Sequence, residues 1–261
     1  MRRLPQLLRP APVATERPAP VSGAGRYVRS FLFERLVIGS LGVMLPVALV
    51  FLDWGLFEGN PVPRDSLSAY YYSGMREWFV LTVGTTGFFL IAYKITEKNL
   101  DNTLSIFGGG CGLLIPIFST ARTAAEKIDG LPLTPLQNLV GEKAVQVVHF
   151  AASTGFILAL GGISILFGRR EAARPPHGNR RSPGFWRIFH FACAGAIGAA
   201  GIWILVTLKI VEGPYWSLLA GETACAVAFG ASWFAKGYEI QYLLGRGSPG
   251  DIPARSHSQA V

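Results

Sequence analysis

The stretch AVQVVHFAASTGFILALGGISILFG, residues 144–168, contains no Asp, Glu, Lys or Arg and is followed at once by Arg169 and Arg170. A helix of about 20 apolar residues crosses the ~30 Å hydrocarbon core of a bilayer. A charge-free run of this length, ended by basic residues, is typical of a membrane-spanning helix that stops at the membrane surface. The stretch therefore predicts an integral membrane protein.

Five further apolar stretches have the same character. Together the six predicted spans are Leu36–Leu52, Trp78–Tyr93, Leu104–Thr120, Ala144–Gly168, Trp186–Leu208 and Tyr215–Ala235. Because lipid offers no hydrogen bonds, each span must satisfy its own backbone groups, as a helix does. The predicted fold is all-α: a polytopic integral membrane bundle of six transmembrane helices over residues 31–238.

The basic residues lie mostly on one side of these spans. Of the 24 Lys and Arg residues, 18 fall in the two terminal segments and in the connections after the second and fourth spans. Cytoplasmic segments carry such an excess, so both termini are expected in the cytoplasm, with the bundle in a bacterial inner (plasma) membrane. Residues 1–30 are predicted to be a disordered basic tail and residues 239–261 a flexible one. The basic residues that flank the membrane account for the net charge of +8. No nucleic acid is therefore expected as a partner.

Ionisable residues inside a span are unusual, because each costs about 2.5–3.5 kcal/mol on insertion scales. Glu142, Gln146, His149 and Ser153 are spaced 4, 3 and 4 apart, which puts them on one face of the fourth span. Glu222 lies about two turns into the sixth span, at a depth similar to that of His149. We expect His149 and Glu222 to meet on the external half of the bundle.

Two other ionisable residues are predicted near the cytoplasmic surface. His190 lies one turn into the fifth span, and Lys236 closes the sixth span, where it is expected to snorkel to the interface. His190 and His149 therefore approach opposite surfaces and cannot share a site.

Small residues concentrate in the third, fourth and fifth spans. Those spaced four apart, such as Gly195 and Ala199, are expected to let helix backbones approach closely.

The loop before the second span is the other concentration of polar residues. Its second half, Ser66–Ser73, is rich in Ser and Tyr and runs directly into the span. One interpretation is an aromatic belt at the membrane interface. The other is a segment that folds over the external mouth of the bundle and brings Ser68, together with Ser66, Tyr70 and Tyr71, towards His149.

Three segments of the chain resemble motifs of bacterial six-helix membrane proteins of unknown function. They are Asp65–Tyr71 (DSLSAYY), Val148–Ala152 (VHFAA) and, after Glu222, Gly230–Gly237 (GASWFAKG). These proteins are similar to the Frag/DRAM/Sfk group, whose eukaryotic members are linked to membrane lipid handling. The resemblance covers about residues 33–237 and implies a site on the external half of the bundle.

No cofactor and no metal site is predicted. A more distant similarity connects the chain to ceramidase-like amidases, which hold zinc with several His residues. Here only His149 lies on the external side, too few ligands for zinc. The three cysteines, Cys111, Cys193 and Cys225, lie within spans and are interpreted as packing residues.

Three functions stay open on the sequence. In the first, a site on the external half of the bundle recognises or modifies a membrane lipid, with Ser68, His149 and Glu222 as the catalytic residues and Ser66, Tyr70, Tyr71, Glu142, Gln146 and Ser153 binding the lipid. In the second, the protein is a non-enzymatic scaffold, sensor or assembly factor, and the same residues form a structural clasp. In the third, Glu222 carries protons in a small transporter. The oligomeric state is not readable from the chain.

Overall fold

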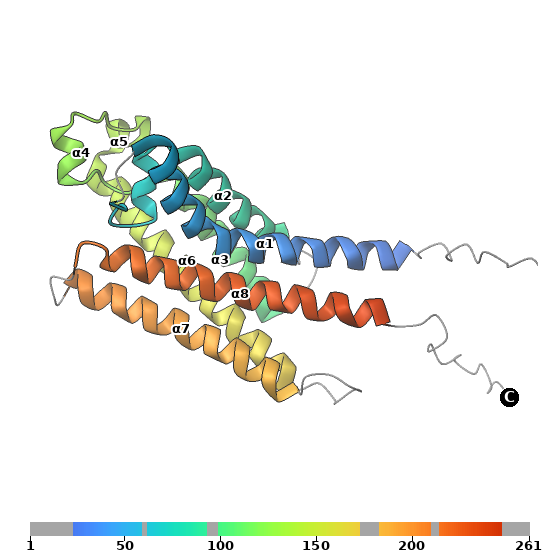
Figure 1. The fold of residues 1–261 in the computed structure, drawn as a ribbon. Helices are drawn as coiled ribbons and strands as arrows, with labels where there is room; N and C mark the ends of the chain where they lie inside the picture. Colours follow the sequence, from blue (N-terminus) through green and yellow to red (C-terminus); the bar gives the residue numbers. More distant parts are fainter. Residues whose placement is uncertain (1–22, 59–61, 93–98, 173–182, 210–213, 247–261) are drawn as a thin grey trace, which may run out of the picture.

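The computed structural model of the chain describes residues 23–58, 62–92, 99–172, 183–209 and 214–246, and these are helical with connecting loops and no strand. Six long helices form the body of the molecule (Figure 1). They are α1 (Gly23–Asp53), α2 (Arg76–Ala92), α3 (Leu100–Ile117), α6 (Glu142–Ala172), α7 (Pro183–Lys209) and α8 (Ser217–Arg246). Four short helices lie between them: η1 (Trp54–Glu58), η2 (Ser68–Tyr72), α4 (Ala124–Ile128) and α5 (Pro135–Val140).

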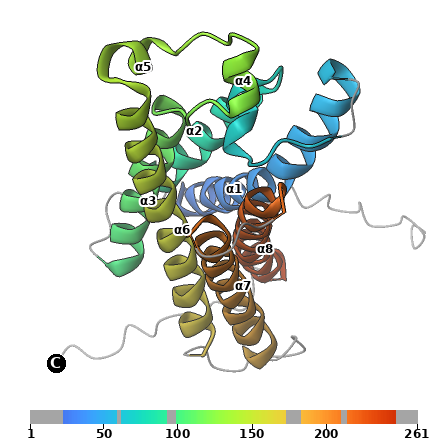
Figure 2. The ribbon, with the colours of Figure 1, turned by 90° about the vertical axis from the view of Figure 1, so that its left-hand side faces the viewer.

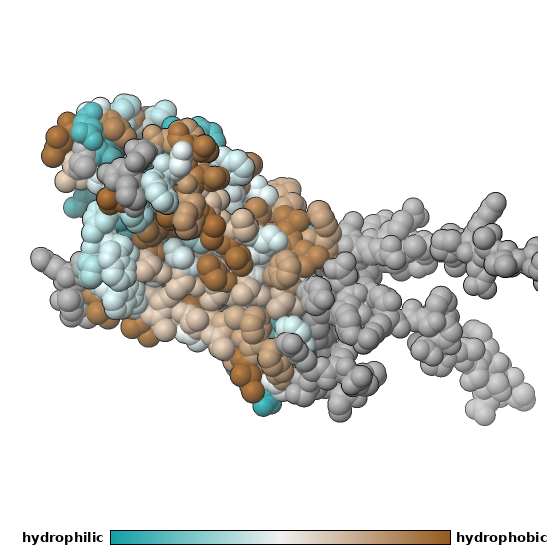
Figure 3. Space-filling model, in the orientation of Figure 1, coloured by the Kyte–Doolittle hydropathy of each residue, from teal (hydrophilic) through white to brown (hydrophobic). Residues whose placement is uncertain are grey.

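Five of the long helices are long and apolar enough to cross a membrane. Their candidate spans are Leu32–Phe57, Leu100–Ile117, Glu142–Glu171, Gly184–Leu208 and Ser217–Gly237. Helix α2, the predicted second span, has 17 residues and is not among them. The outer surface is apolar, as hydrocarbon requires: Trp78, Leu81 and Phe88 on α2 are all more than half exposed. Figure 3 shows apolar side chains along the flank of the bundle.

The long helices alternate in direction, which gives the bundle two distinct ends. We call the end that carries η2, α4 and α5 the loop end, and the end where α1 begins and α8 ends the tail end (Figures 1 and 2). Helix α1 starts at Gly23, inside the segment predicted as an N-terminal tail, and α8 continues to Arg246, inside the predicted C-terminal tail. Residues 1–22 and 247–261 lie outside the described residues.

Glycines allow two pairs of helices to pack with their backbones almost touching. A Cβ on Gly39 of α1 would lie 2.5 Å from the backbone nitrogen of Phe234 on α8, and one on Gly87 of α2 would lie 2.8 Å from the carbonyl oxygen of Gly109 on α3. The prediction that Gly195 and Ala199 of the fifth span allow a close helix contact is wrong. A Cβ on Gly195 would meet nothing within 4 Å, and Ala199 is exposed. Small residues on α7 line the outside of the bundle rather than a close helix contact.

Two buried apolar clusters form the core, one at each half of the bundle. The first, around Phe167, Phe229 and Trp233, joins the middle of the bundle to the tail end. The second lies at the loop end, and Tyr70, Tyr71 and Met75 belong to it. The loop before α2 is therefore part of the core, not a surface connection.

Candidate functional site

The segment before α2 folds back into the loop end of the bundle. Ser66, Leu67, Ser68, Ala69, Tyr70 and Tyr71 are all buried. The Ser66 hydroxyl accepts a hydrogen bond from the backbone N–H of Ala69 at 3.1 Å, which starts the single 3₁₀ turn of η2. The Leu219 N–H donates to the Asp65 carbonyl at 2.8 Å and fixes the segment to α8. In the structure this loop folds over the mouth of the bundle, which is the second of the two interpretations given above.

His149 is the first of the two groups that hold this turn. Its Nδ1 lies 2.7 Å from the Phe118 carbonyl oxygen and 3.3 Å from that of Ile115, and its Nε2 lies 3.0 Å from the Ser68 hydroxyl. Because carbonyl oxygens only accept hydrogen bonds, Nδ1 carries a proton. In the neutral form of this ring, which is only 2% exposed, Nε2 accepts a hydrogen bond from the Ser68 hydroxyl.

Glu222 is the second group, and it binds the backbone of the same turn. Its Oε2 accepts the Leu67 N–H at 2.6 Å, and the Ser68 N–H also donates to this carboxylate. These amides begin η2 and have no partner within that short helix, so a carboxylate is a favourable cap.

The predicted contact between His149 and Glu222 is therefore indirect. Among the described residues their hydrogen bonds do not join each other; both converge on residue 68, one on its hydroxyl and the other on its backbone. The three predicted catalytic residues do come together, in a chain centred on Ser68.

A small cavity lies beside this chain. It has a volume of about 90 Å³ and is lined by Ser68, Ser153 and Glu222 together with apolar side chains such as Phe79 and Phe156. A water molecule occupies about 30 Å³ of liquid, so the cavity has room for a few waters but not for a lipid headgroup.

The other predicted binding residues divide between several places. Ser153 faces the cavity, whereas Glu142 binds Arg122 at 3.2 Å in the roof of the loop end. Tyr70 is 1% exposed and belongs to the apolar core. Gln146 is partly buried, and no hydrogen bond joins it to residue 68 within the described part of the chain. The polar stripe on α6 thus does not form one continuous site.

A second buried polar cluster lies at the tail end, and sequence analysis did not find it. Lys236 of α8 forms an ion pair with Glu171 of α6, and both side chains are almost completely buried. The prediction that Lys236 snorkels to the interface is therefore wrong. His190 of α7 is fully buried and lies 2.9 Å from the Ser232 hydroxyl.

Further charges surround this pair. The buried Arg35 guanidinium of α1 lies 5.7 Å from the ring centre of Phe167, and Asp101 of α3 pairs with Arg170 of α6. We call Arg35, Glu171, His190, Ser232 and Lys236 the tail-end cluster. Arg35 and Glu171 could have indicated this cluster, because each lies close to the end of a predicted span. The predicted spans Leu36–Leu52 and Ala144–Gly168 leave both residues outside.

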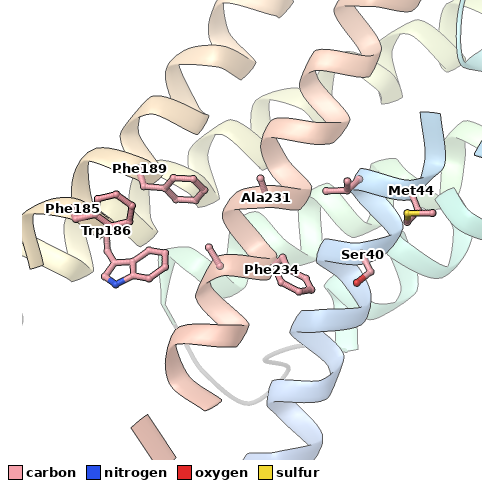
Figure 4. A pocket seen from close by; sticks show the side chains of 9 residues that line it. Ser40, Met44, Phe185, Trp186, Phe189, Ala231 and Phe234 are labelled. Carbon is pink, nitrogen blue, oxygen red and sulfur yellow. The ribbon is translucent and has the colours of Figure 1, made fainter. Parts of the chain in front are cut away.

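Two apolar grooves open on the outer surface of the bundle. One, of about 540 Å³, crosses α8 between α1 and α7; Figure 4 shows Phe185, Trp186 and Phe189 on one side of it and Ser40 and Met44 on the other. The second groove, of about 420 Å³, runs between α6 and α7 past their small residues. Both lie within the candidate membrane spans.

No metal centre is formed by the described residues, since none of their His, Cys, Asp and Glu side chains gather in groups of three or more able to hold an ion. Cys111, Cys193 and Cys225 are buried and form no disulfide, and the Cys225 thiol donates to the Ile197 carbonyl at 3.7 Å.

The fold and its apolar helices indicate a multi-pass helical membrane protein. The chain matches no family model, no curated protein and no solved structure.

Proposed function

We propose that this chain is a non-catalytic multi-pass membrane protein that recognises membrane lipid, and that Ser68, His149 and Glu222 form a clasp. The clasp holds the segment before α2 in place and so shapes the loop end. We also propose that the chain is related to the Frag/DRAM/Sfk-like proteins, whose eukaryotic members are linked to membrane lipid handling. The two apolar grooves support contact with lipid, because each is wide enough for acyl chains and faces the membrane region.

One observation carries the choice of recognition over modification. Glu222 occupies the backbone N–H groups of Ser68 itself and of the preceding residue, Leu67. A serine that attacks an acyl carbonyl needs free donors of this kind to stabilise the oxyanion that forms. With both N–H groups bound to Glu222, neither is free to stabilise an oxyanion. The adjoining cavity of about 90 Å³ is also too small for a headgroup.

A second candidate function is acyl transfer or hydrolysis with Ser68 as nucleophile. The Ser68 hydroxyl lies 3.0 Å from a neutral Nε2 of His149, whose ring is oriented through Nδ1 by the Phe118 carbonyl. This is the geometry by which a histidine takes the proton of an attacking serine. The Glu222 carboxylate would have to release residues 67 and 68 for the reaction.

A fluorophosphonate probe separates the two candidates, because it reacts covalently with serines that are activated by a base. Purified protein in detergent is treated with the probe beside Ser68→Ala. The clasp predicts no labelling at Ser68 and a lower unfolding temperature for Ser68→Ala, since His149 Nε2 loses its donor. Labelling that disappears in Ser68→Ala would overturn the non-catalytic proposal.

Lipid recognition is tested separately by native mass spectrometry of the same sample. We expect phospholipid to remain bound through mild delipidation. A protein that stays folded but retains none, and binds none on addition, would refute the proposal.

We also propose that α2 makes a sixth crossing and that both chain ends lie in the cytoplasm of a bacterial inner membrane. The support is the excess of Lys and Arg in the connections at the tail end. Fusions of alkaline phosphatase and of green fluorescent protein at residue 132 and at the C-terminus test this. We expect phosphatase activity only at residue 132 and fluorescence only at the C-terminus; the reverse pattern would refute the orientation.

A further inference from the structure

The loop end has a surface pocket that is separate from the buried clasp. Its volume is about 410 Å³; Tyr71, Tyr72, Ser73 and Arg76 form one wall, and residues 131–135, which lead into α5, form the other. None of these lining residues is acidic. The pocket therefore has a polar wall that carries Arg76, the one formal charge among its lining residues, and a mostly apolar wall of Leu and Pro side chains.

Tyr71 holds the Arg76 side chain in position without neutralising its charge. Its Nη2 donates to the Tyr71 hydroxyl at 2.7 Å, and its guanidinium lies 4.4 Å from the centre of the Tyr71 ring. A guanidinium has five N–H donors, so most of its donors stay available. Across the described residues no carboxylate lies within ion-pair distance of Arg76.

The neighbouring loop-end cations differ in this respect. Arg64 binds Glu126 at 2.9 Å, Arg122 binds Glu142 at 3.2 Å, and Lys127 lies 3.8 Å from Glu142. Carboxylates at this end therefore pair with Arg64, Arg122 and Lys127, whereas among the described residues Arg76 and the exposed Lys143 form no ion pair. Of these two cations, Arg76 lines the pocket.

The floor of the pocket is rigid. The Tyr72 hydroxyl donates to the Thr120 carbonyl at 2.6 Å and accepts from the Gln137 amide at 2.8 Å. Burial raises the pKa of Tyr72 above its ordinary value, so the phenol stays protonated and keeps this bond. Thr134 and Gln137 complete a reciprocal cap on α5 and fix the opposite wall.

The first turns of α2, where Arg76 lies, also carry exposed apolar side chains on another face of the helix. Trp78, two residues after Arg76, is 54% exposed, and Leu81, one turn further, is 65% exposed. Exposed tryptophans mark the level of lipid headgroups, and the apolar residues beyond them face hydrocarbon. Arg76 lies about 3 Å from Trp78 along the helix axis, so with the proposed crossing by α2 it stands at the depth of the phosphate groups.

We propose that this pocket binds the phosphate of a membrane phospholipid, with the Arg76 guanidinium as the main ligand and Tyr71 as the group that positions it. A guanidinium fork matches phosphate oxygens and forms charge-assisted hydrogen bonds with them. The inference rests on the proposed lipid recognition and adds to it the chemical group that is recognised.

Native mass spectrometry of the full chain in detergent tests the proposal with two lipids of the same acyl chains. Phosphatidic acid carries the phosphate and diacylglycerol lacks it. The variants are Arg76→Gln, Arg76→Lys, Tyr71→Phe and, as a matched control, Arg187→Gln, which removes an exposed arginine at the tail end.

We expect phosphatidic acid to bind at least tenfold more tightly than diacylglycerol. Arg76→Gln should remove this difference, while Arg187→Gln keeps it. Arg76→Lys keeps the charge but not the fork and should retain part of the preference, and Tyr71→Phe should weaken it by a few-fold. Arg76→Lys keeps the positive charge and Tyr71→Phe keeps the aromatic ring. A partial loss of lipid preference in these two variants therefore indicates a weakened phosphate contact and not an unfolded protein.

Three results would overturn the inference. The first is equal loss of phosphatidic acid binding in Arg76→Gln and Arg187→Gln, which would indicate general charge attraction. The second is equal binding of both lipids by the unaltered protein, which would leave lipid recognition standing without a phosphate site. The third is full displacement of phosphatidic acid by low millimolar inorganic phosphate, which would assign the pocket to a free anion. Binding of neither lipid would instead refute the proposed function itself.

Discussion

The two buried polar clusters of this bundle stabilise their polar groups in different ways. At the loop end, the Ser68 hydroxyl and the His149 ring share a hydrogen bond, and the Glu222 carboxyl group is satisfied by backbone N–H groups. At the tail end, opposite charges on different helices pair directly, as in Lys236 with Glu171.

The difference predicts how much unfolding free energy is lost when one side chain of each cluster is removed. A buried neutral hydrogen bond contributes about 0.5–1.5 kcal/mol, and losing one partner costs about 1–3 kcal/mol. Removing one partner of a buried ion pair costs about 3–5 kcal/mol, because the other charge stays in an apolar environment. The tail-end cluster should therefore dominate stability, whereas the loop-end clasp should control the local structure of one segment.

The largest expected effect is that of Lys236→Met. This change leaves Glu171 buried with its ammonium partner gone, and we expect a loss of about 3–5 kcal/mol of unfolding free energy. The double variant Lys236→Met/Glu171→Met should recover most of the loss. Thermal unfolding in detergent measures both, and a double variant no more stable than the single one would contradict a pairwise role.

The second test concerns the helix contact that brings Arg35 next to α8. Gly39→Ala places a Cβ against the Phe234 backbone, which cannot move aside locally, so we expect about 1–3 kcal/mol of destabilisation. Gly195→Ala is the matched control, because its Cβ enters open space and alanine favours the helix. Equal unfolding temperatures for the two variants would show that the α1–α8 contact is not tight.

The third test separates local from global effects at the loop end. Glu222→Gln replaces the carboxyl group that accepts the Leu67 N–H by an amide and should cost about 1–2 kcal/mol. Hydrogen exchange should accelerate at residues 67–72 and remain unchanged at the tail end. A uniform increase along the whole chain would mean that Glu222 stabilises the entire bundle instead of one turn.

The smallest expected effect is that of Ser66→Ala. The Ser66 hydroxyl accepts one hydrogen bond, from the Ala69 N–H, so its removal should cost about 1 kcal/mol. The loss should be confined to faster exchange in η2, with lipid binding retained. A change as large as that of Glu222→Gln would indicate that Ser66 belongs to the clasp.

Much of the fold follows directly from the composition of the segments. Charge-free runs such as residues 144–168 are long enough to cross a bilayer only as helices, so the all-helical bundle was predictable without tertiary information. The identity of the loop-end residues was predictable too, because a polar side chain within such a run needs a partner. His149 and Glu222 were selected on that basis, and Ser68 was selected from the Ser- and Tyr-rich loop before the second span. The structure brings the three together.

What the sequence alone could not determine is how the polar groups pair. Whether Glu222 meets a histidine or two backbone amides depends on where η2 is held, and that depends on contacts with α3, α6 and α8 that are distant along the chain. Lys236 illustrates the same limit: near a helix end, composition favours snorkelling, and only the packing of α6 against α8 places Glu171 beside it. Composition thus determined the helices, because the bilayer acts on each segment separately, while tertiary packing decided the partners, because a hydrogen bond or an ion pair depends on the position of two segments at once.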